Sequence, residues 1–335
     1  MFDEYYYISA GKYRRYHGES MVAKLLDVKT MWFNFRDIFR LGKGMVESYF
    51  LLKKLRPSSV LLKGGYVCVP VGFGASKSGA FIITHDSDTV PGLANKLVSR
   101  YASVHATGMP VELYNYPKDK IFYTGVPINN LYRTYSANEV RFLKEKYSID
   151  SNRRVVLVMG GSLGAERLNN LIAQITQSLI SKANAYLICI TGRDKAKKFS
   201  RVAGQSEYLY VVEFTSELFE YTAMADLVIA RAGATAMAEL AHQKKTVLLV
   251  PNTDLPGGHQ LENAKYYQKI DAVEMVKESE INEVGPIYLE KKVVKLLDDQ
   301  SRSKQLAKNL AAAVPEDPAG TLARLLIDRK IPHKQ

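Results

Sequence analysis

The chain has 335 residues, of which 46 are Lys or Arg and 34 are Asp or Glu, so its formal net charge is +12 and its pI about 9.4. This length favours two domains, and no apolar run is long enough for a transmembrane helix. The positive charge favours a polyanionic partner. Because no zinc-ligand spacing, DNA-binding basic helix or RNP-type aromatic motif supports nucleic-acid binding, we expect an anionic membrane surface and no nucleic acid.

Cysteine and histidine usage points to a cytoplasmic protein without a metal or cofactor. Cys68 and Cys189 lie in apolar, strand-like contexts, as expected of reduced thiols in the core. The six histidines show no metal-ligand spacing with them. The first 20 residues lack the apolar core of a signal peptide.

The first long amphipathic segment runs from residue 29 to 54 and predicts a helix. An aromatic and basic helix can lie in the headgroup interface of a membrane, whereas an ordinary amphipathic helix turns its apolar stripe to the core. We expect residues 45–55 to face the core. Before them, so many large rings close to cations are hard to bury on one side, which favours membrane contact. The expected membrane residues are Trp32, Phe33, Phe35, Arg36, Phe39, Arg40 and Lys43.

The rest of the first half alternates between short apolar runs and helical patterns. We expect strands at residues 60–62, 81–85 and 121–124. A polar stretch at 129–152 includes a helical segment and carries the domain boundary. The expected domains are therefore residues 1–148 and 149–335.

The second half opens with a strand, a glycine loop and a helix. Residues 155–159 are apolar and lead into the sequence GGSLG at 160–164, and a helical pattern follows. Glycine lets the backbone turn sharply and approach a ligand, and the free amides of a helix start favour anions. A nucleotide phosphate is the expected ligand, although glycine after a strand also serves turn geometry alone.

A second segment repeats this arrangement. Residues 227–230 form a short apolar run, 231–235 form the turn, and a helix follows. A phosphate on the amides near Gly233 would leave Glu239 about one helical turn, roughly 5–6 Å, farther along. A carboxylate there suits a ribose diol. The alternative is a solvated first-turn Glu stabilised by the helix dipole.

Two such loops in one domain favour nucleotide binding. The other expected strands of this half alternate with helices, which predicts a parallel α/β sheet that binds ligands beyond the carboxyl ends of its strands. They lie at residues 186–191, 208–214, 246–250 and 272–276.

Blocks of sequence spread over most of the chain occur in the order typical of one family. They are ISAGK (8–12), RRY (14–16), KGGYV (63–67) with Pro70, HDSDTVPGLANK (85–96), TGVP (124–127), GGS (160–162) with GA (164–165), EF (213–214), RAGA (231–234), HQ (259–260) and NA (263–264). The block at 85–96 is the most specific. Together they resemble the MurG family of peptidoglycan glycosyltransferases, glycosyltransferase family 28.

The resemblance implies an α/β protein of the GT-B class, with two Rossmann-like domains facing a cleft and a last helix, residues 317–329, packed on the first domain. It implies inverting, metal-independent transfer of N-acetylglucosamine from UDP-GlcNAc to lipid I, undecaprenyl-pyrophosphoryl-MurNAc-pentapeptide, which gives lipid II. The expected location is the cytoplasmic face of the plasma membrane, as a peripheral protein.

The resemblance also implies site residues. The acceptor cleft would include Gly64, Gly65, Tyr66 and His85. The donor site would include Asp88, Asn129, Gly161, Ser162, Thr215, Arg231, Gly233, Ala234, Thr235, Ala236, Met237, Ala238, Glu239, His259, Gln260 and Asn263.

One departure from the family is large. Its members begin with a strand and a GGTGGH loop that faces the acceptor pyrophosphate, and this chain opens after that segment, so at least one unit of roughly 30 residues is expected to be missing. A misassigned start, a split gene and a degenerate remnant all remain open. The alternative function is therefore a non-catalytic, donor-binding subunit that needs a separate fragment carrying the lost loop. Smaller departures are Asp86 in place of Glu, Asn129 in place of Arg and Leu163 in place of Gln.

The missing segment also carries the family's usual catalytic histidine. Asp88 and His85 are the remaining candidates for proton transfer from the acceptor hydroxyl. Asp86-Ser87-Asp88 could be taken for a DxD metal motif, since paired carboxylates suit divalent ions. The rest of the chain matches a metal-independent fold, so we expect helix-start amides to stabilise the leaving phosphate.

Overall fold

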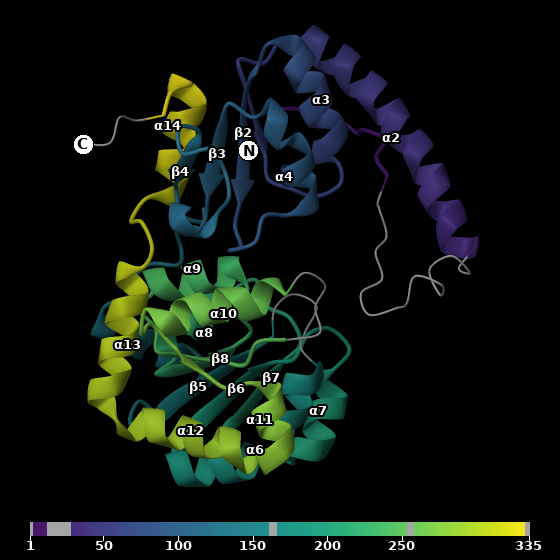
Figure 1. Ribbon diagram of the computed structural model, residues 1–335. Coiled ribbons are helices and arrows are strands. Elements are labelled where there is room, and N and C mark those ends of the chain that lie inside the picture. The colour runs from purple at the N-terminus through teal and green to yellow at the C-terminus, as the bar shows by residue number, and fades with distance from the viewer. Residues whose placement is uncertain (1–2, 12–27, 161–165, 253–257, 332–335) are drawn as a thin grey trace. The chain divides into compact units, whose positions relative to one another are not determined.

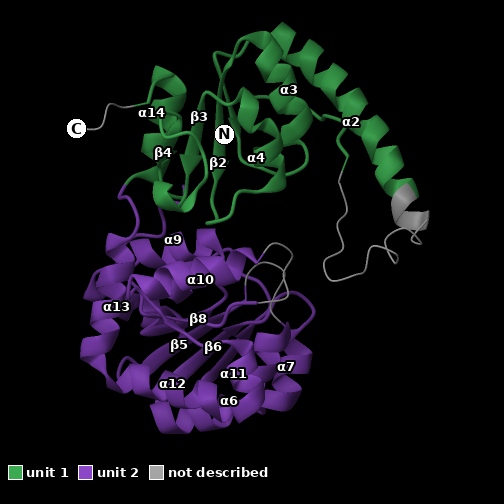
Figure 2. Cartoon of the chain, viewed as in Figure 1, with its two compact units in different colours: residues 1–126, 317–335 green, residues 127–316 purple. Residues whose placement is uncertain are grey.

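The computed structural model describes residues 3–11, 28–160, 166–252 and 258–331, with side chains in the first helix from Trp32 onward. The chain divides into two compact units, coloured separately in Figure 2. Unit 1 comprises Met1–Val126 and Asp317–Gln335, and unit 2 comprises Pro127–Glu316. The expected boundary after residue 148 therefore lies inside unit 2.

Unit 1 contains a parallel sheet in the order β1-β2-β3-β4. Three of these strands lie where the sequence predicts them, and β3 was not predicted. Residues 5–8, a Tyr-Tyr-Tyr-Ile run of high β-propensity, form no strand. The strands are β1 (Ser59–Leu62), β2 (Phe81–Asp86), β3 (Val104–Thr107) and β4 (Ile121–Tyr123).

Helices cover both faces of this sheet (Figure 1). On one face, Leu62 and Ile82 form a core cluster with Val98 at the end of α4. On the other face, Leu322 and Leu325 of α14 pack in one cluster with residues of β2 and β3. The segments are α2 (Val28–Leu55), α3 (Cys68–Ser78), α4 (Leu93–Val98), the 3-10 turns Ser99–Tyr101 and Val111–Leu113, and α14 (Pro318–Asp328).

Helix α2 packs against α3 through small and polar residues. Ser48 is buried, and a Cβ on Gly74 of α3 would lie 2.8 Å from the Ser48 backbone, so the two helices approach closely. Leu52 is buried farther along, but Val46 and Phe50 are exposed. The expectation that residues 45–55 face the core is therefore only partly right. Ser48 and Leu52 are buried, but large apolar side chains of the same segment remain exposed.

Unit 2 contains, within its described residues, a parallel sheet in the order β10-β9-β8-β5-β6-β7. Its strands confirm the sequence prediction: β5, β6 and β8 lie within one residue of the expected bounds, whereas β7, β9 and β10 are shorter than expected. They are β5 (Arg154–Met159), β6 (Ala185–Ile190), β7 (Leu209–Val212), β8 (Leu227–Ala230), β9 (Val247–Leu249) and β10 (Glu274–Met275). The helices are α5 (Ala137–Lys146), α6 (Glu166–Ala183), α7 (Ala196–Ala203), α8 (Leu218–Met224), α9 (Ala234–His242), α10 (His259–Lys269), α11 (Glu278–Val284), α12 (Ile287–Asp298) and α13 (Gln300–Ala312).

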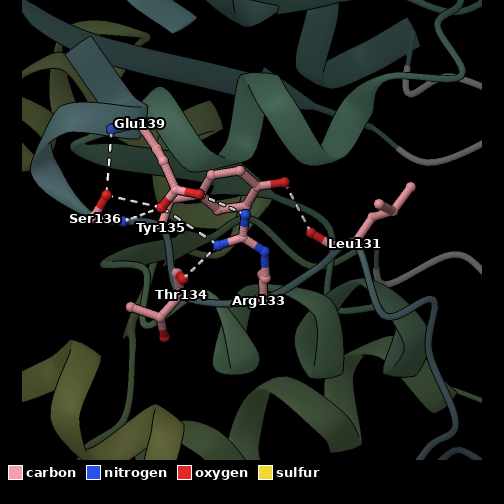
Figure 3. A network of polar contacts seen from close by, with 6 residues as sticks. All are labelled: Leu131, Arg133, Thr134, Tyr135, Ser136 and Glu139. Carbon is pink, nitrogen blue, oxygen red and sulfur yellow. Dashed lines mark hydrogen bonds and ion pairs between the residues drawn. The ribbon is translucent and has the colours of Figure 1, made fainter. Parts of the chain in front are cut away.

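A capping box fixes the start of α5, the first helix of unit 2 (Figure 3). The Ser136 amide donates to Glu139 Oε2 at 2.7 Å, and the Glu139 amide donates to Ser136 Oγ at 3.3 Å. Arg133 adds an ion pair to Glu139 at 2.6 Å. Two helix-end donors are satisfied in this way, so the polar stretch before α5 is ordered locally.

Candidate functional site

The strand order in the sheet of unit 2 reverses between β5 and β8. From β5 the strands continue to β6 and β7 on one side, and β8 to β10 continue on the other. Met159, the last residue of β5, is paired with Ala230, the last of β8, so the two glycine loops begin side by side. Such switch points are where open α/β sheets bind ligands. Gly161 and Ser162, expected in the donor site, lie outside the described residues.

The loop after β8 leads directly into the start of α9. Gly233 is the N-cap of α9, and no side chain caps the helix. The first amide bonded within the helix is that of Met237, which donates to the Gly233 carbonyl. A Cβ on Gly233 would meet nothing within 4 Å. The Gly233 amide itself donates to the Arg231 carbonyl at 3.0 Å. The amides of Ala234, Thr235 and Ala236 precede the first bonded one and lie beside this open space, which is an arrangement suited to an anion.

Glu239 lies one turn along the same helix, on the face of the exposed Thr235. Burial raises the pKa of the Glu239 carboxyl to about 7. Its charge in turn raises the pKa of Tyr132, after the larger effect of burial. A half-buried carboxyl with a raised pKa is typical of a functional site rather than of a solvated helix end. Met237 and Ala238 are buried, so they contribute backbone only.

Arg231 and Asn263 hold this loop in place through their side chains. Arg231 Nη1 donates to the Val250 carbonyl at 2.7 Å, and Nη2 forms an ion pair with Glu278 at 2.6 Å. Asn263 Nδ2 donates to the Ala232 carbonyl at 3.0 Å. Both residues were expected to bind the donor, and in the structure their polar atoms position the loop. No sequence pattern pointed to Glu278.

The start of α10 lies at the same edge of the sheet, because it follows β9. The Asn252 amide donates to Gln260 Oε1 at 3.2 Å. His259 Nδ1 is buried without a hydrogen-bond partner among the described residues. Of the other expected donor residues, Thr215 Oγ1 accepts from the Glu217 amide, and Asn129 Oδ1 accepts from the Leu131 amide. Each of these two side chains stabilises its own turn.

In unit 1, the residues expected in the acceptor cleft gather at the carboxyl ends of β1 and β2. Gly64 and Gly65 have φ values of +90° and +83°, which side chains rarely adopt. Tyr66 is half exposed. Lys63 Nζ lies 3.3 Å from His85 Nδ1 and connects the two strand ends. Burial lowers the pKa of the Lys63 ammonium.

His85 has partners for both ring nitrogens. With Lys63 donating to Nδ1, the Nε2–H donates to the Gly125 carbonyl at 2.9 Å. Burial, and secondarily Lys63, lowers the pKa of His85 to about 4. A neutral imidazole with both nitrogens engaged positions the loops and has no lone pair free for a proton, so it is a poor general base in this state.

Asp86 organises the HDSDTVPGLANK block. Its Oδ1 accepts from Asn95 Nδ2 at 2.8 Å and from the Gly92 amide at 3.1 Å, and its Oδ2 accepts from Tyr116 Oη at 2.9 Å. Both oxygens of the Asp86 carboxylate are therefore engaged in hydrogen bonds. Asp88, two residues later, is half exposed. Among the described residues no group of three or more His, Cys, Asp and Glu side chains could hold a metal ion.

The sequence predicted a strand-like context for Cys68, but in the structure Cys68 is the first residue of α3. Its thiol donates to the Gly64 carbonyl at 2.7 Å. Cys189 is buried in β6, and both cysteines are free. The Cys68 contact helps to hold the Gly64-Gly65 turn.

Comparison with known proteins identifies the family. The model of the glycosyltransferase family 28 N-terminal domain matches residues 5–107, and that of the C-terminal domain matches residues 155–318. The chain is 32% identical over 324 residues to the UDP-N-acetylglucosamine–N-acetylmuramyl-(pentapeptide) pyrophosphoryl-undecaprenol N-acetylglucosamine transferase of Geobacillus thermodenitrificans, covering 96% of this chain and 83% of the relative. The chain belongs to glycosyltransferase family 28.

Two further similarities agree. The enzyme of the same name from Clostridium tetani is 36% identical over 289 residues, covering 86% of this chain and 75% of the relative. The crystal structure of Acinetobacter baumannii MurG matches with a TM-score of 0.69 at 21% identity, covering 88% of this chain and 80% of that one. The similarity confirms the expected α/β GT-B fold, and the family makes the chain a glycosyltransferase.

Proposed function

We propose that this glycosyltransferase moves N-acetylglucosamine from UDP-GlcNAc to lipid I and so forms lipid II. The observation that carries the proposal is the uncapped start of α9 at the switch point of unit 2, with Glu239 one turn away. The names of the relatives supply the donor and the acceptor. At identities of 32–36% they support this substrate pair for the chain.

The donor would bind to unit 2. Its phosphates would lie against the amides from Ala234 to Ala236, and the Glu239 carboxylate would accept hydrogen bonds from the ribose hydroxyls. Negative charge grows on the β-phosphate as its bond to the anomeric carbon breaks. Fixed amides at a helix start stabilise that charge without reorganising, so the step requires no metal ion.

The acceptor would meet the Gly64-Gly65 turn and the block that begins at His85. Its hydroxyl attacks the anomeric carbon from the face opposite UDP, which inverts the configuration, and UDP leaves with the bonding electrons. The hydroxyl proton must pass to a base. Because both nitrogens of His85 are engaged, the half-exposed Asp88 is our candidate within unit 1.

A membrane-bound acceptor requires the protein to reach a bilayer surface. No helix of the described residues is both long and apolar enough to cross a membrane. The outward face of α2 carries large apolar side chains instead: Trp32, Phe35 and Phe39 are 64%, 55% and 65% exposed. Phe33 is half buried, with the Arg36 guanidinium 4.8 Å from its ring centroid.

Cations accompany this exposed face. Arg40 and Lys43 are exposed, with side-chain fractions of 54% and 70%, and each has one acidic neighbour at 3.6–3.7 Å. Exposed aromatic rings beside cations match the composition of helices that lie in a headgroup interface. We therefore place the activity at the cytoplasmic face of the plasma membrane, with α2 in contact with anionic lipid.

The test is a transfer assay with labelled UDP-GlcNAc and a short-chain lipid I analogue. The proposal predicts label in a product that co-migrates with the lipid II analogue, with UDP released in equal amount. UDP-glucose serves as the control donor and should transfer poorly. Donor binding without any transfer would contradict the enzyme and favour the donor-binding subunit.

A further inference from the structure

Unit 1 contains a cavity on one side of the HDSDTVPGLANK block. Its volume is about 620 Å³, which lies within the range of small-ligand sites. It opens between the end of α4 and the loop that connects β3 to β4. It is lined by Thr89, Val90, Pro91, Lys96, Ser99, Arg100, His105, Leu113, Asn115, Tyr116, Pro117 and Lys120.

The charged side chains that line the cavity are all cationic. Lys96, Arg100 and Lys120 line it, and no Asp or Glu does. Lys96 and Arg100 are exposed, whereas Lys120 is half buried. Concave walls of low dielectric constant concentrate the field of such cations, so the cavity attracts anions more strongly than an open surface would.

A buried histidine adds a directional group. His105 is 2% exposed, and its ring stacks on Tyr116 with centroids 3.8 Å apart and planes 3° from parallel. Thr84 Oγ1 lies 2.8 Å from His105 Nδ1. Burial, and secondarily Lys120, lowers the pKa of His105 to about 4, so the ring is neutral at pH 7. When Thr84 donates to Nδ1, the proton of the neutral ring is on Nε2, where it can donate to an anion.

The cavity wall is held in place before any ligand binds. Tyr116 Oη donates to Asp86 Oδ2 at 2.9 Å, and Tyr114 Oη donates to the Asp88 carbonyl at 2.7 Å. These bonds attach the loop between β3 and β4 to the loop after β2. A preformed wall lowers the ordering cost of binding. Val90, Pro91 and Leu113 add apolar surface beside the cations.

We propose that this cavity binds a phosphoryl group attached to a small organic moiety. Three cations and an imidazole N–H suit the phosphate oxygens, and the apolar wall with the Tyr116 ring suits the attached carbon skeleton. The headgroup of an anionic phospholipid and a soluble phosphate monoester share this chemistry. The cavity shares Thr89, Val90, Pro91 and Lys96 with the HDSDTVPGLANK block, but its lining includes no donor-site residue and none of Gly64, Gly65, Tyr66 and His85. The proposal is therefore tested separately from the transfer reaction.

The experiment is calorimetric titration of the full chain with glycerol 3-phosphate, with dihexanoyl phosphatidylglycerol below its micelle concentration, and with dihexanoyl phosphatidylcholine as the zwitterionic control. Each titration is repeated with saturating UDP, because a phosphate bound at the donor site would then be displaced. The variants are Lys120→Ala and Lys120→Arg. Lys118→Ala is the matched control, since Lys118 is an exposed lysine of the same loop that does not line the cavity.

We expect at least one anionic probe to bind in the presence of UDP. Lys120→Ala should weaken that binding about tenfold, the usual effect of losing a charge-assisted hydrogen bond. Lys120→Arg should restore most of the affinity, and Lys118→Ala should change it less than twofold. Binding of phosphatidylglycerol alone would identify a lipid headgroup, and binding of glycerol 3-phosphate alone a soluble ester. Equal losses for Lys118→Ala and Lys120→Ala, or no binding of either anion, would overturn the proposal.

Discussion

Arg231 and Glu278 form a buried ion pair in unit 2, with Nη2 and Oε1 2.6 Å apart and side-chain exposures of 6% and 8%. The other oxygen of Glu278 lies 3.4 Å from Arg167 Nη1, at the start of α6. One carboxylate therefore contacts the loop after β8 and the helix after the other glycine loop. This arrangement links the loop after β8 to the first turn of α6.

Glu278→Gln should lower the free energy of unfolding of unit 2 by about 3–5 kcal/mol, because it leaves the buried Arg231 charge without its counter-charge. Glu290→Gln is the control: Glu290 is equally buried, but its partner Lys182 is 54% exposed, so about 1 kcal/mol or less is expected. Urea unfolding followed by circular dichroism measures both. Equal losses of unfolding free energy in the two variants would mean that the buried Arg231–Glu278 pair stabilises the protein no more than the exposed pair does.

Gly233→Ala should weaken UDP binding while leaving the fold intact. Gly233 has a φ of −74°, which alanine adopts freely, and its Cβ would enter open space. The methyl group would then stand where the donor phosphate is proposed to approach. The loss of stability should be about 1 kcal/mol or less, as for other N-cap changes. Gly42→Ala, whose Cβ also meets nothing within 4 Å, is the control. Unchanged UDP affinity in Gly233→Ala would place the phosphates elsewhere.

The raised pKa of Glu239 predicts that donor binding depends on pH. If the carboxylate accepts hydrogen bonds from the ribose, affinity for UDP-GlcNAc should rise about tenfold between pH 6 and pH 8, as a group of pKa about 7 ionises. Glu239→Gln should abolish this dependence. The stability of the ligand-free chain should change in the opposite sense: burial favours the protonated form, so this contribution is present below about pH 4.5 and is lost as the pH rises through 7. A flat affinity profile in the wild-type chain would contradict the ribose contact.

Much of unit 2 could be predicted, because strands such as β5 and β8 are continuous apolar runs followed by a glycine-containing turn. Val155 and Leu227, for example, are fully buried within such runs. The strand order could not be predicted, since pairing between β5 and β8 is a long-range choice that no local pattern encodes. The same holds for Glu278, whose partner Arg231 lies far away in the sequence.

In unit 1 the sequence was less informative. β3 contains His105 and Thr107, two polar residues that disguise a buried strand, because their side chains are satisfied by Thr84 and by the Met109 carbonyl. Tyr5 to Tyr7 have high β-propensity but find no neighbouring strand in the described structure. Local β-propensity therefore did not predict strand formation in these two segments, because long-range contacts determine it.

The exposed face of α2 predicts reversible binding to anionic vesicles. Replacing both Trp32 and Phe35 by alanine should reduce co-sedimentation with phosphatidylglycerol liposomes by at least about tenfold, since each ring that enters an apolar phase contributes about 1.5–3 kcal/mol. Phe142→Ala is the control, because Phe142 is an equally exposed ring on α5 of unit 2. Equal binding to neutral and anionic vesicles, or no effect of the double substitution, would place the membrane surface elsewhere.

The central claim is that unit 2 binds UDP-GlcNAc through the loop after β8 and Glu239. Calorimetry on the full chain with UDP-GlcNAc, and with GTP as the competing nucleotide, tests it most directly. We predict clear preference for UDP-GlcNAc and a loss of about tenfold or more in Glu239→Ala, because the ribose loses a charge-assisted hydrogen bond. Binding of UDP-GlcNAc no tighter than that of GTP, or an affinity that Glu239→Ala leaves unchanged, would contradict the account.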